Sequence, residues 1–322
     1  MYGFCTPMVH VNGISKLQAK KNYPSLDMLA GGQKKVEVNN VPQKHREKVV
    51  IIMGATGTGK SKLSMYLAKC YEAELINSDK MQVYEGLDIV TNKVTEAEQC
   101  EVPHHLLGIL DPYADFAVER FCEMALVSIE SILSRGRLPI IVGGSNTYIE
   151  ALIDGEEYKF RSKYDCCFLW VDVSLAEHQS FLSIRVDQMV ENGMEEELRK
   201  MFDPNVDYSK GIFRSIGVPE FDQYFRTEPH LEKETRKKLF RKGLSEMKEN
   251  TCQLARRQQE KIHRLKDVKG WDMHRLDATE VFRKQGKEAE GAWKDLVATP
   301  SKRIVDQFLN KAGHQLARVS GH

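Results

Sequence analysis

The stretch GATGTGKS, residues 54–61, constrains the fold of this chain more than any other feature. It matches the pattern G-x-x-x-x-G-K-[ST], in which backbone N–H groups at the start of a helix surround a phosphate. The apolar run KVVIIMG (48–54) precedes it and predicts a buried strand, and the residues from Ser61 onward predict a helix. This phosphate loop therefore predicts a bound diphosphate or polyphosphate, without naming the reaction.

Further apolar runs alternate with helical patterns along the chain. They are AELINSD (73–79), LPIIVGG (138–144) and CCFLWVDV (166–173). Continuous apolar strands separated by helices are typical of a parallel sheet covered on both faces. We therefore predict an α/β fold: a P-loop NTPase-like parallel sheet in residues 46–204, with helices on both faces, followed by a mainly helical C-terminal region (205–322) that completes the acceptor site. A long helix is expected from about 230 to 265.

Composition excludes several classes of protein. The chain has 47 basic and 46 acidic residues, so no overall field favours a nucleic acid or a membrane surface. No apolar stretch approaches the roughly 18 residues of a membrane span, which predicts a soluble protein. The seven cysteines are odd in number and form no C-x-x-C pair, which indicates reduced thiols and argues against a zinc site or a disulfide scaffold.

Residues 1–45 differ from the rest of the chain. They hold six lysines and two acidic residues and show no sustained periodicity. A disordered tail and an organelle transit peptide both fit this composition. Scarce acidic residues favour the transit peptide, whereas only two serines and no arginine argue against it. We expect the plastid stroma as the location, with the cytoplasm as the alternative.

Most proteins with such a phosphate loop need a carboxylate near it, and two of the predicted strands have an aspartate at or near their end. Asp79 stands where the second strand leaves the sheet, at the carboxyl edge where open α/β sheets bind ligands. Asp172 is expected to lie within its strand, because Val173 follows it, and to have a structural role. The residues alone leave three roles open for Asp79: binding a metal, fixing a nucleotide or accepting a proton.

Seven blocks in order carry a resemblance to the isopentenyltransferase family, which includes tRNA dimethylallyltransferases and the adenylate isopentenyltransferases that begin cytokinin synthesis. The resemblance runs from about residue 48 to residue 266. The blocks are GATGTGKSKLSMYLA, ELINSDKMQVYEGLDIVTNK, VPHHLLGILDP, RLPIIVGGSNTYIEAL, RVDQMVENGMEEELRKMF, RSIGVPEF and NTCQLARRQQEKIHRL.

The resemblance implies a prenyltransferase in which the phosphate loop binds the diphosphate leaving group of dimethylallyl diphosphate. Asp79 matches the family's general base, which accepts a proton from N6 of adenine; a carboxylate that orients magnesium is the alternative role. Lys60 and Mg²⁺ held by Ser61 would stabilise the departing diphosphate. The residues implied for diphosphate or nucleotide binding are Gly54, Ala55, Thr56, Gly57, Thr58, Gly59, Lys60, Ser61 and Ser145.

Other positions follow from the resemblance one by one. Arg185 resembles the family's diphosphate-binding arginine, with an ordinary helix-surface arginine as the alternative. Ser145 stands where tRNA-modifying members tend to have threonine, and the preceding glycines, Gly143 and Gly144, are expected to allow close approach of the substrate. Adjacent side chains diverge, so His104 and His105 are expected to have a packing or turn role rather than to bind metal. Candidates for the acceptor's phosphates are Lys93, Arg214, Lys248, Arg256 and Arg257.

The acceptor is expected to be a free adenine nucleotide: ATP or ADP, or AMP. In tRNA-modifying members a sizeable inserted helical domain follows the GG-x-x-x-Y block, whereas here about ten residues, EEYKFRSKYD, precede the next strand. We expect no tRNA partner, no membrane and a monomer. The alternatives are a tRNA dimethylallyltransferase, a P-loop small-molecule or nucleotide kinase, and a non-catalytic nucleotide- or RNA-binding module. No D-D-x-x-D motif supports a terpenoid-type enzyme.

Overall fold

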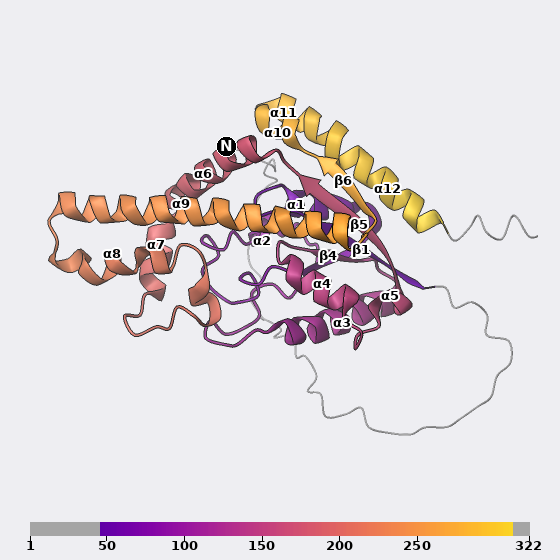
Figure 1. The fold of residues 1–322 in the computed structure, drawn as a ribbon, viewed down its shortest axis with the longest axis horizontal. Helices are drawn as coiled ribbons and strands as arrows, with labels where there is room; N and C mark the ends of the chain where they lie inside the picture. The colour runs from indigo at the N-terminus through magenta and orange to yellow at the C-terminus, as the bar shows by residue number, and fades with distance from the viewer. Residues whose placement is uncertain (1–45, 312–322) are drawn as a thin grey trace, which may run out of the picture. The chain divides into compact units, whose positions relative to one another are not determined.

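A computed structural model of the protein describes residues 46–311, so the predictions for residues 1–45 lie outside the described part. Six parallel strands form one sheet in the order β3-β2-β4-β1-β5-β6 (Figure 1). The strands are β1 (Glu47–Met53), β2 (Glu74–Asn77), β3 (His104–His105), β4 (Pro139–Val142), β5 (Tyr164–Asp172) and β6 (Met273–Asp277). The parallel sheet predicted from the apolar runs is confirmed.

Helices connect the strands and continue beyond them. They are α1 (Lys60–Tyr71), α2 (Glu96–Gln99), α3 (Val118–Ser134), α4 (Asn146–Asp154), α5 (Phe160–Lys163), α6 (Leu175–Glu191), α7 (Met194–Met201), α8 (Asp222–Thr227), α9 (Lys233–His263), α10 (Thr279–Arg283), α11 (Gly286–Trp293) and α12 (Thr299–Asn310). Helix α9 confirms the long helix expected in this region, and it is 31 residues long. It runs past the sheet and packs against α6 and α8 (Figure 1).

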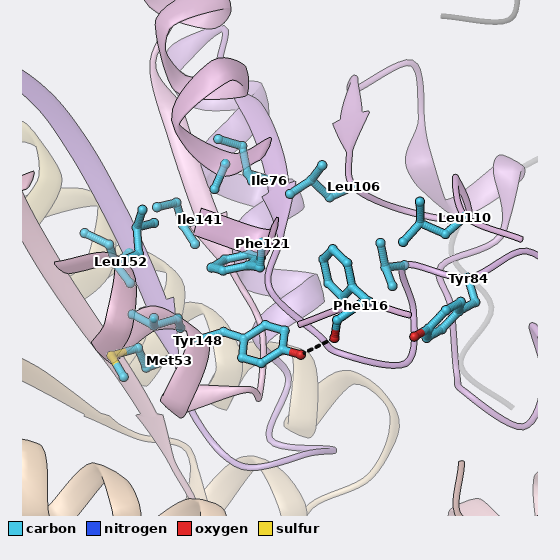
Figure 2. Close-up of a cluster of buried hydrophobic side chains, with 14 of the residues drawn as sticks. Met53, Ile76, Tyr84, Leu106, Leu110, Phe116, Phe121, Ile141, Tyr148 and Leu152 are labelled. Carbon is cyan, nitrogen blue, oxygen red and sulfur yellow. Dashed lines mark hydrogen bonds between the residues drawn. The ribbon is translucent and has the colours of Figure 1, made fainter. Parts of the chain in front are cut away.

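Alternate residues of β1 face two separate apolar layers. Ile51 and Met53 belong to the layer that contains Phe121 of α3 and Leu152 of α4. Figure 2 shows this layer, in which the Tyr148 hydroxyl donates a hydrogen bond to the Phe116 carbonyl at 2.9 Å. Such a continuous apolar layer supplies most of the driving force for folding.

The opposite layer contains Val50 and Ile52 of β1, Leu63 and Leu67 of α1, and Val305 of α12. Both faces of the central strand are therefore covered by helices, as the uninterrupted apolar runs predict.

Strand β6 is the main departure from the expected architecture. It comes from the region predicted to be mainly helical, yet it pairs in parallel with β5 over the residues from Met273 to Asp277. Its sequence, MHRLD, buries only Met273 and Leu276, so it lacks the apolar run that marks the other strands. Residues on both sides of position 204 consequently share one sheet and belong to one compact unit.

Among residues 46–311 no helix is both long and apolar enough to span a bilayer. The six cysteines in this part of the chain form no disulfide. Burial raises the pKa of the Cys122 thiol to about 11 and those of Cys166 and Cys167 to about 12, so these thiols are protonated at neutral pH.

Candidate active site

The phosphate loop, residues 54–61, joins β1 to α1 at the carboxyl edge of the sheet. Gly57 has a φ of 79°, and a side chain there would place Cβ 2.8 Å from Leu182 Cδ2. Gly59 precedes α1 with a φ of 93° and offers no side chain to cap the helix. The N–H groups of the first helical turn therefore remain available to an anion, with the positive end of the helix dipole behind them.

Lys60 lies inside this loop. Its Nζ donates a hydrogen bond of 2.6 Å to the Ala55 carbonyl, which also accepts from Thr58 Oγ1 at 3.0 Å. Burial lowers the pKa of Lys60 to about 8, opposed by the negative charge of Asp79 and reinforced by the positive charge of Arg185. Lys60 in the loop, Asp79 after β2 and Arg185, which bonds to Thr56 of the loop, thus lie within electrostatic reach of one another.

Asp79 follows β2 and is partly buried. Its backbone N–H donates to Asn77 Oδ1 at 3.1 Å, and its carboxylate Oδ1 accepts from the Met81 N–H at 2.9 Å. Oδ2 has no hydrogen-bond partner among the residues that the structure describes. The carboxylate is thus oriented through one oxygen, and the other is available to a ligand.

Arg185 reaches the phosphate loop from α6. Its Nη2 donates to Thr56 Oγ1 at 3.1 Å, while Nε is buried without a hydrogen-bond partner. Burial lowers the pKa of the guanidinium to about 10, opposed by Asp79, so it is positively charged at neutral pH. The alternative of an ordinary arginine on the outer helix surface does not fit this position.

Ser145 precedes α4, in the loop that follows β4. Its Oγ accepts a hydrogen bond from the Lys80 N–H at 2.9 Å, and its own N–H donates to the Ser78 carbonyl at 3.2 Å. Ser145 therefore lies against both neighbours of Asp79. Its hydroxyl contacts the backbone that positions the carboxylate.

The two glycines before Ser145 pack closely against other parts of the protein. A Cβ on Gly143 would collide with Ser78, and a Cβ on Gly144 would lie 2.5 Å from Gln258 Nε2. Side-chain and backbone atoms of Ser78 and the side-chain amide of Gln258 therefore occupy the space beside these glycines, and the close approach of substrate stays a prediction.

Two polar residues at this edge were missed by the sequence analysis. Gln258 of α9 accepts the Thr56 N–H at 2.7 Å through Oε1. His178 of α6 lies 2.8 Å from the Thr56 carbonyl through Nε2, and burial lowers its pKa, so the neutral ring donates that bond. Gln258 stands in a block that the family resemblance already included, but nothing local in the sequence assigns it a partner 202 residues away.

The two aspartates have different environments. Asp172 ends β5 instead of lying within it, which corrects the predicted position. Its carboxylate forms a salt bridge with Arg275 at 2.7 Å and accepts a hydrogen bond from Gln259. These contacts join β5 to β6 and α9 and fit a structural role.

The candidate phosphate-binding cations separate into three groups. Lys93 pairs with Asp88 and Lys248 pairs with Asp187, so both are engaged within the fold. Arg256 and Arg257 are exposed on α9. Arg214 lies near Lys80, whose pKa is lowered by burial and by the positive charge of Arg214.

The site thus carries an excess of positive charge around one carboxylate. Among residues 46–311, Lys60, Lys80, Arg185 and Arg214 form no salt bridge. Such a cluster suits a polyanionic ligand.

The predicted packing role of the histidine pair agrees with the structure. His104 and His105 form β3, and His105 Nε2 lies 2.6 Å from Glu74 Oε2. Within the described part of the chain no group of three or more His, Cys, Asp or Glu residues is placed to bind a metal.

The family model and the sequence relatives that match this chain point to the same protein family. The IPP transferase family model matches residues 82–163 and 155–264. Adenylate isopentenyltransferase 3, chloroplastic, of Arabidopsis thaliana is 58% identical over 83% of this chain and 81% of its own length. Adenylate isopentenyltransferase 7, mitochondrial, of the same plant is 48% identical over 86% of this chain and 84% of its own length.

Solved structures share the fold. A eukaryotic dimethylallyltransferase acting on tRNA matches 82% of this chain and 80% of its own, with a TM-score of 0.68 and 26% identity. The tRNA isopentenylpyrophosphate transferase of Bacillus halodurans matches 77% of this chain and 99% of its own, with a TM-score of 0.59 and 26% identity. Together with the sequence relatives, these matches place the chain in the IPP transferase family, as a prenyltransferase whose similar curated relatives are adenylate isopentenyltransferases.

Proposed function

We propose that the protein transfers the dimethylallyl group of dimethylallyl diphosphate to N6 of the adenine of ATP or ADP, or of AMP, and releases diphosphate. The observation that carries this proposal is the position of one carboxylate, Asp79, beside the cationic phosphate loop. A kinase with the same fold would bind ATP in this loop. The 58% identity to an adenylate isopentenyltransferase supports prenyl transfer instead.

The donor side stabilises the leaving group. The allylic C–O bond breaks, positive charge develops on the dimethylallyl carbon, and the bonding electron pair leaves with the diphosphate. The loop N–H groups, Lys60 and Arg185 face the negative charge that grows on the diphosphate oxygens. Preorganised donors of this kind lower the barrier because they need no reorientation during the reaction.

The acceptor side makes the amine reactive. The lone pair of adenine N6 is delocalised into the ring, so the amine attacks poorly while it keeps both protons. As the C–N bond forms, Asp79 accepts one of these protons through its free Oδ2. General-base assistance of this kind contributes about 10²–10⁴-fold to the rate.

A magnesium ion fits the donor side. The exposed hydroxyl of Ser61 at the start of α1 supplies one hard oxygen ligand. Mg²⁺ commonly binds through one or two protein oxygens together with substrate phosphates and water, so the absence of a carboxylate cluster within residues 46–311 is compatible with it. When bound there, the ion would neutralise charge on the departing diphosphate.

A free nucleotide is the favoured acceptor. Only the four-residue helix α5 lies between α4 and β5, where tRNA-modifying enzymes are expected to carry an inserted domain. Lys80, which follows Asp79 in the sequence, and Arg214 near Lys80 form no salt bridge within residues 46–311 and would provide charge for the nucleotide's phosphates. A tRNA acceptor remains the alternative because the solved relatives include enzymes that act on tRNA.

A competition assay tests this function. The purified protein receives dimethylallyl diphosphate with equal concentrations of AMP, ADP, ATP and unmodified tRNA, and mass spectrometry identifies every product. We expect N6-prenylated ATP and ADP with all their phosphates retained. Prenylated tRNA as the main product would support the alternative acceptor, and phosphate transfer without prenylation would overturn the proposal.

Location and assembly are part of the same proposal. Similar relatives carry chloroplastic and mitochondrial names, and we propose the plastid stroma for this chain. A full-length protein with a fluorescent tag at its C-terminus would co-localise with chlorophyll autofluorescence. We also propose a monomer, for which light scattering would return a mass near 36.9 kDa for the untagged full-length chain.

A further inference from the structure

One residue of the phosphate loop is held by three side chains from two helices. The Thr56 N–H donates to Gln258 of α9, its carbonyl accepts from His178 of α6, and its hydroxyl accepts from Arg185 of α6. The Thr56 N–H therefore points toward Gln258 instead of toward a phosphate. Its role in the loop is to be fixed in place, and α9 provides one of the bonds that fix it.

Gln258 also holds the loop that carries Ser145. Its Nε2 donates to the Gly144 carbonyl at 2.9 Å, and its backbone carbonyl accepts from Asn146 Nδ2 at 3.1 Å. Ser145 in turn accepts the Lys80 N–H, next to Asp79. One amide thus connects the donor side of the site to the segment that positions the general base.

We propose that Gln258 is a positioning residue that sets the separation between the phosphate loop and Asp79. This inference rests on the proposed function, because the reacting carbon is attached to the diphosphate and the reacting nitrogen lies at the carboxylate. A bond forms only when these two atoms are about 3–3.5 Å apart, and a shift of about 1 Å costs on the order of 10²-fold in rate.

Gly144 gives an independent indication of the same contact. The three heavy atoms nearest to a Cβ built on Gly144 all belong to Gln258, and the nearest is Nε2 at 2.5 Å. Its φ lies outside the left-handed region, so the backbone itself accepts alanine there. The residue is small because the amide of Gln258 occupies the space.

The first test compares two neighbouring glutamines of α9. Gln258→Leu removes both side-chain bonds and keeps the bulk of the side chain. Gln259→Leu is the matched control, because Gln259 bonds to Asp172 and the Val173 carbonyl and not to the phosphate loop. We expect the kcat of Gln258→Leu, per folded molecule, to fall about 10- to 100-fold, and that of Gln259→Leu to stay within about threefold of wild type.

Binding of inorganic diphosphate separates this inference from the proposed function. Calorimetric titration needs no turnover, and we expect weaker binding in Gln258→Leu than in Gln259→Leu because the phosphate loop loses the hydrogen bond that fixes Thr56 in place. If the wild-type protein prenylates no nucleotide, the proposed function fails while this comparison still tests Gln258. Equal diphosphate affinity and equal kcat in the two variants would overturn the inference.

A second test uses the contact between Gly144 and Gln258. Gly144→Ala displaces the amide, so we expect a loss of kcat similar to that of Gln258→Ala. In the double variant the new methyl group occupies the space left by the amide, and the loss should not exceed that of Gln258→Ala alone. Such non-additivity marks two residues in contact. Independent, multiplicative losses would contradict the assigned contact.

Discussion

The donor and acceptor sides of the site are built in different ways. Eight consecutive residues, 54–61, form the phosphate loop, and a strand and a helix next to it in sequence hold its ends. The acceptor side assembles Asp79 after β2, Ser145 after β4 and Gln258 on α9. A local motif therefore specifies most of the donor side, to which α6 adds Arg185, whereas contacts between distant segments specify the acceptor side. Variants on the acceptor side should mainly lower kcat, and variants on the donor side should mainly lower kcat/KM for dimethylallyl diphosphate.

The largest effect is expected on the acceptor side. Asp79→Asn keeps the size of the side chain and removes the proton acceptor, so kcat should fall by about 10²–10⁴-fold. Inorganic diphosphate should bind at least as tightly as to wild type, because a negative charge beside Lys60 and Arg185 is lost. Single-turnover kinetics and calorimetry measure the two quantities. Loss of diphosphate binding together with kcat would instead assign Asp79 to the donor side, as a residue that orients magnesium.

Removal of the loop lysine should act mainly on the donor side. Lys60→Ala deletes a buried positive charge that faces the diphosphate, and kcat/KM for dimethylallyl diphosphate should fall by about 10²–10³-fold. The KM for the nucleotide should change little. A variant in which nucleotide binding fails and the allylic donor still binds normally would show that the loop holds the nucleotide's phosphates.

The pH dependence sharpens the same distinction. Burial lowers the pKa of Lys60 to about 8. The side chain is therefore a positively charged ammonium below that pH and loses its charge above it. Between pH 7 and pH 9 the charged fraction, and with it kcat/KM for the donor, should fall about tenfold.

Two variants control this profile. Lys60→Arg stays charged and should flatten it. Asp79→Asn should move its midpoint to lower pH, because Asp79 raises the pKa of Lys60. A midpoint that is unchanged in both variants would assign the titration to another group.

The smallest effect is expected at Ser145. Ser145→Ala removes the acceptor of the Lys80 N–H, a single hydrogen bond with a net value of about 0.5–1.5 kcal/mol, so kcat should fall about two- to tenfold. Ser145→Thr keeps the hydroxyl and should retain most of the activity. Steady-state assays with saturating donor provide the comparison, and equal losses in both variants would show that the hydroxyl is unimportant.

The features that could be predicted from the sequence are those that stretches of consecutive residues encode. Four apolar runs and the glycine pattern were sufficient to predict the central strands, the phosphate loop and the edge at which Asp79 lies. The family resemblance added Arg185 and Ser145, and the structure places both near the carboxylate or the loop. These features were accessible because burial and loop geometry leave their pattern in consecutive residues.

Features that depend on contacts between residues far apart in the sequence could not be predicted from it. Strand β6 is a short edge strand with two buried residues, and its pairing with β5 compensates for a weak apolar pattern. Gln258 resembles any polar residue of a charged helix until folding brings it to Thr56 and Gly144. The contact of Gly144 with Gln258 could not be predicted for the same reason, since the two residues lie 114 positions apart.

A crystal structure with an unreactive thiodiphosphate analogue of the allylic donor and ATP tests the central claim most directly. We expect the thiodiphosphate within residues 54–61, in contact with Lys60, and adenine N6 within about 3 Å of the Asp79 carboxylate. The β- and γ-phosphates of ATP in the loop, with adenine remote from Asp79, would contradict it.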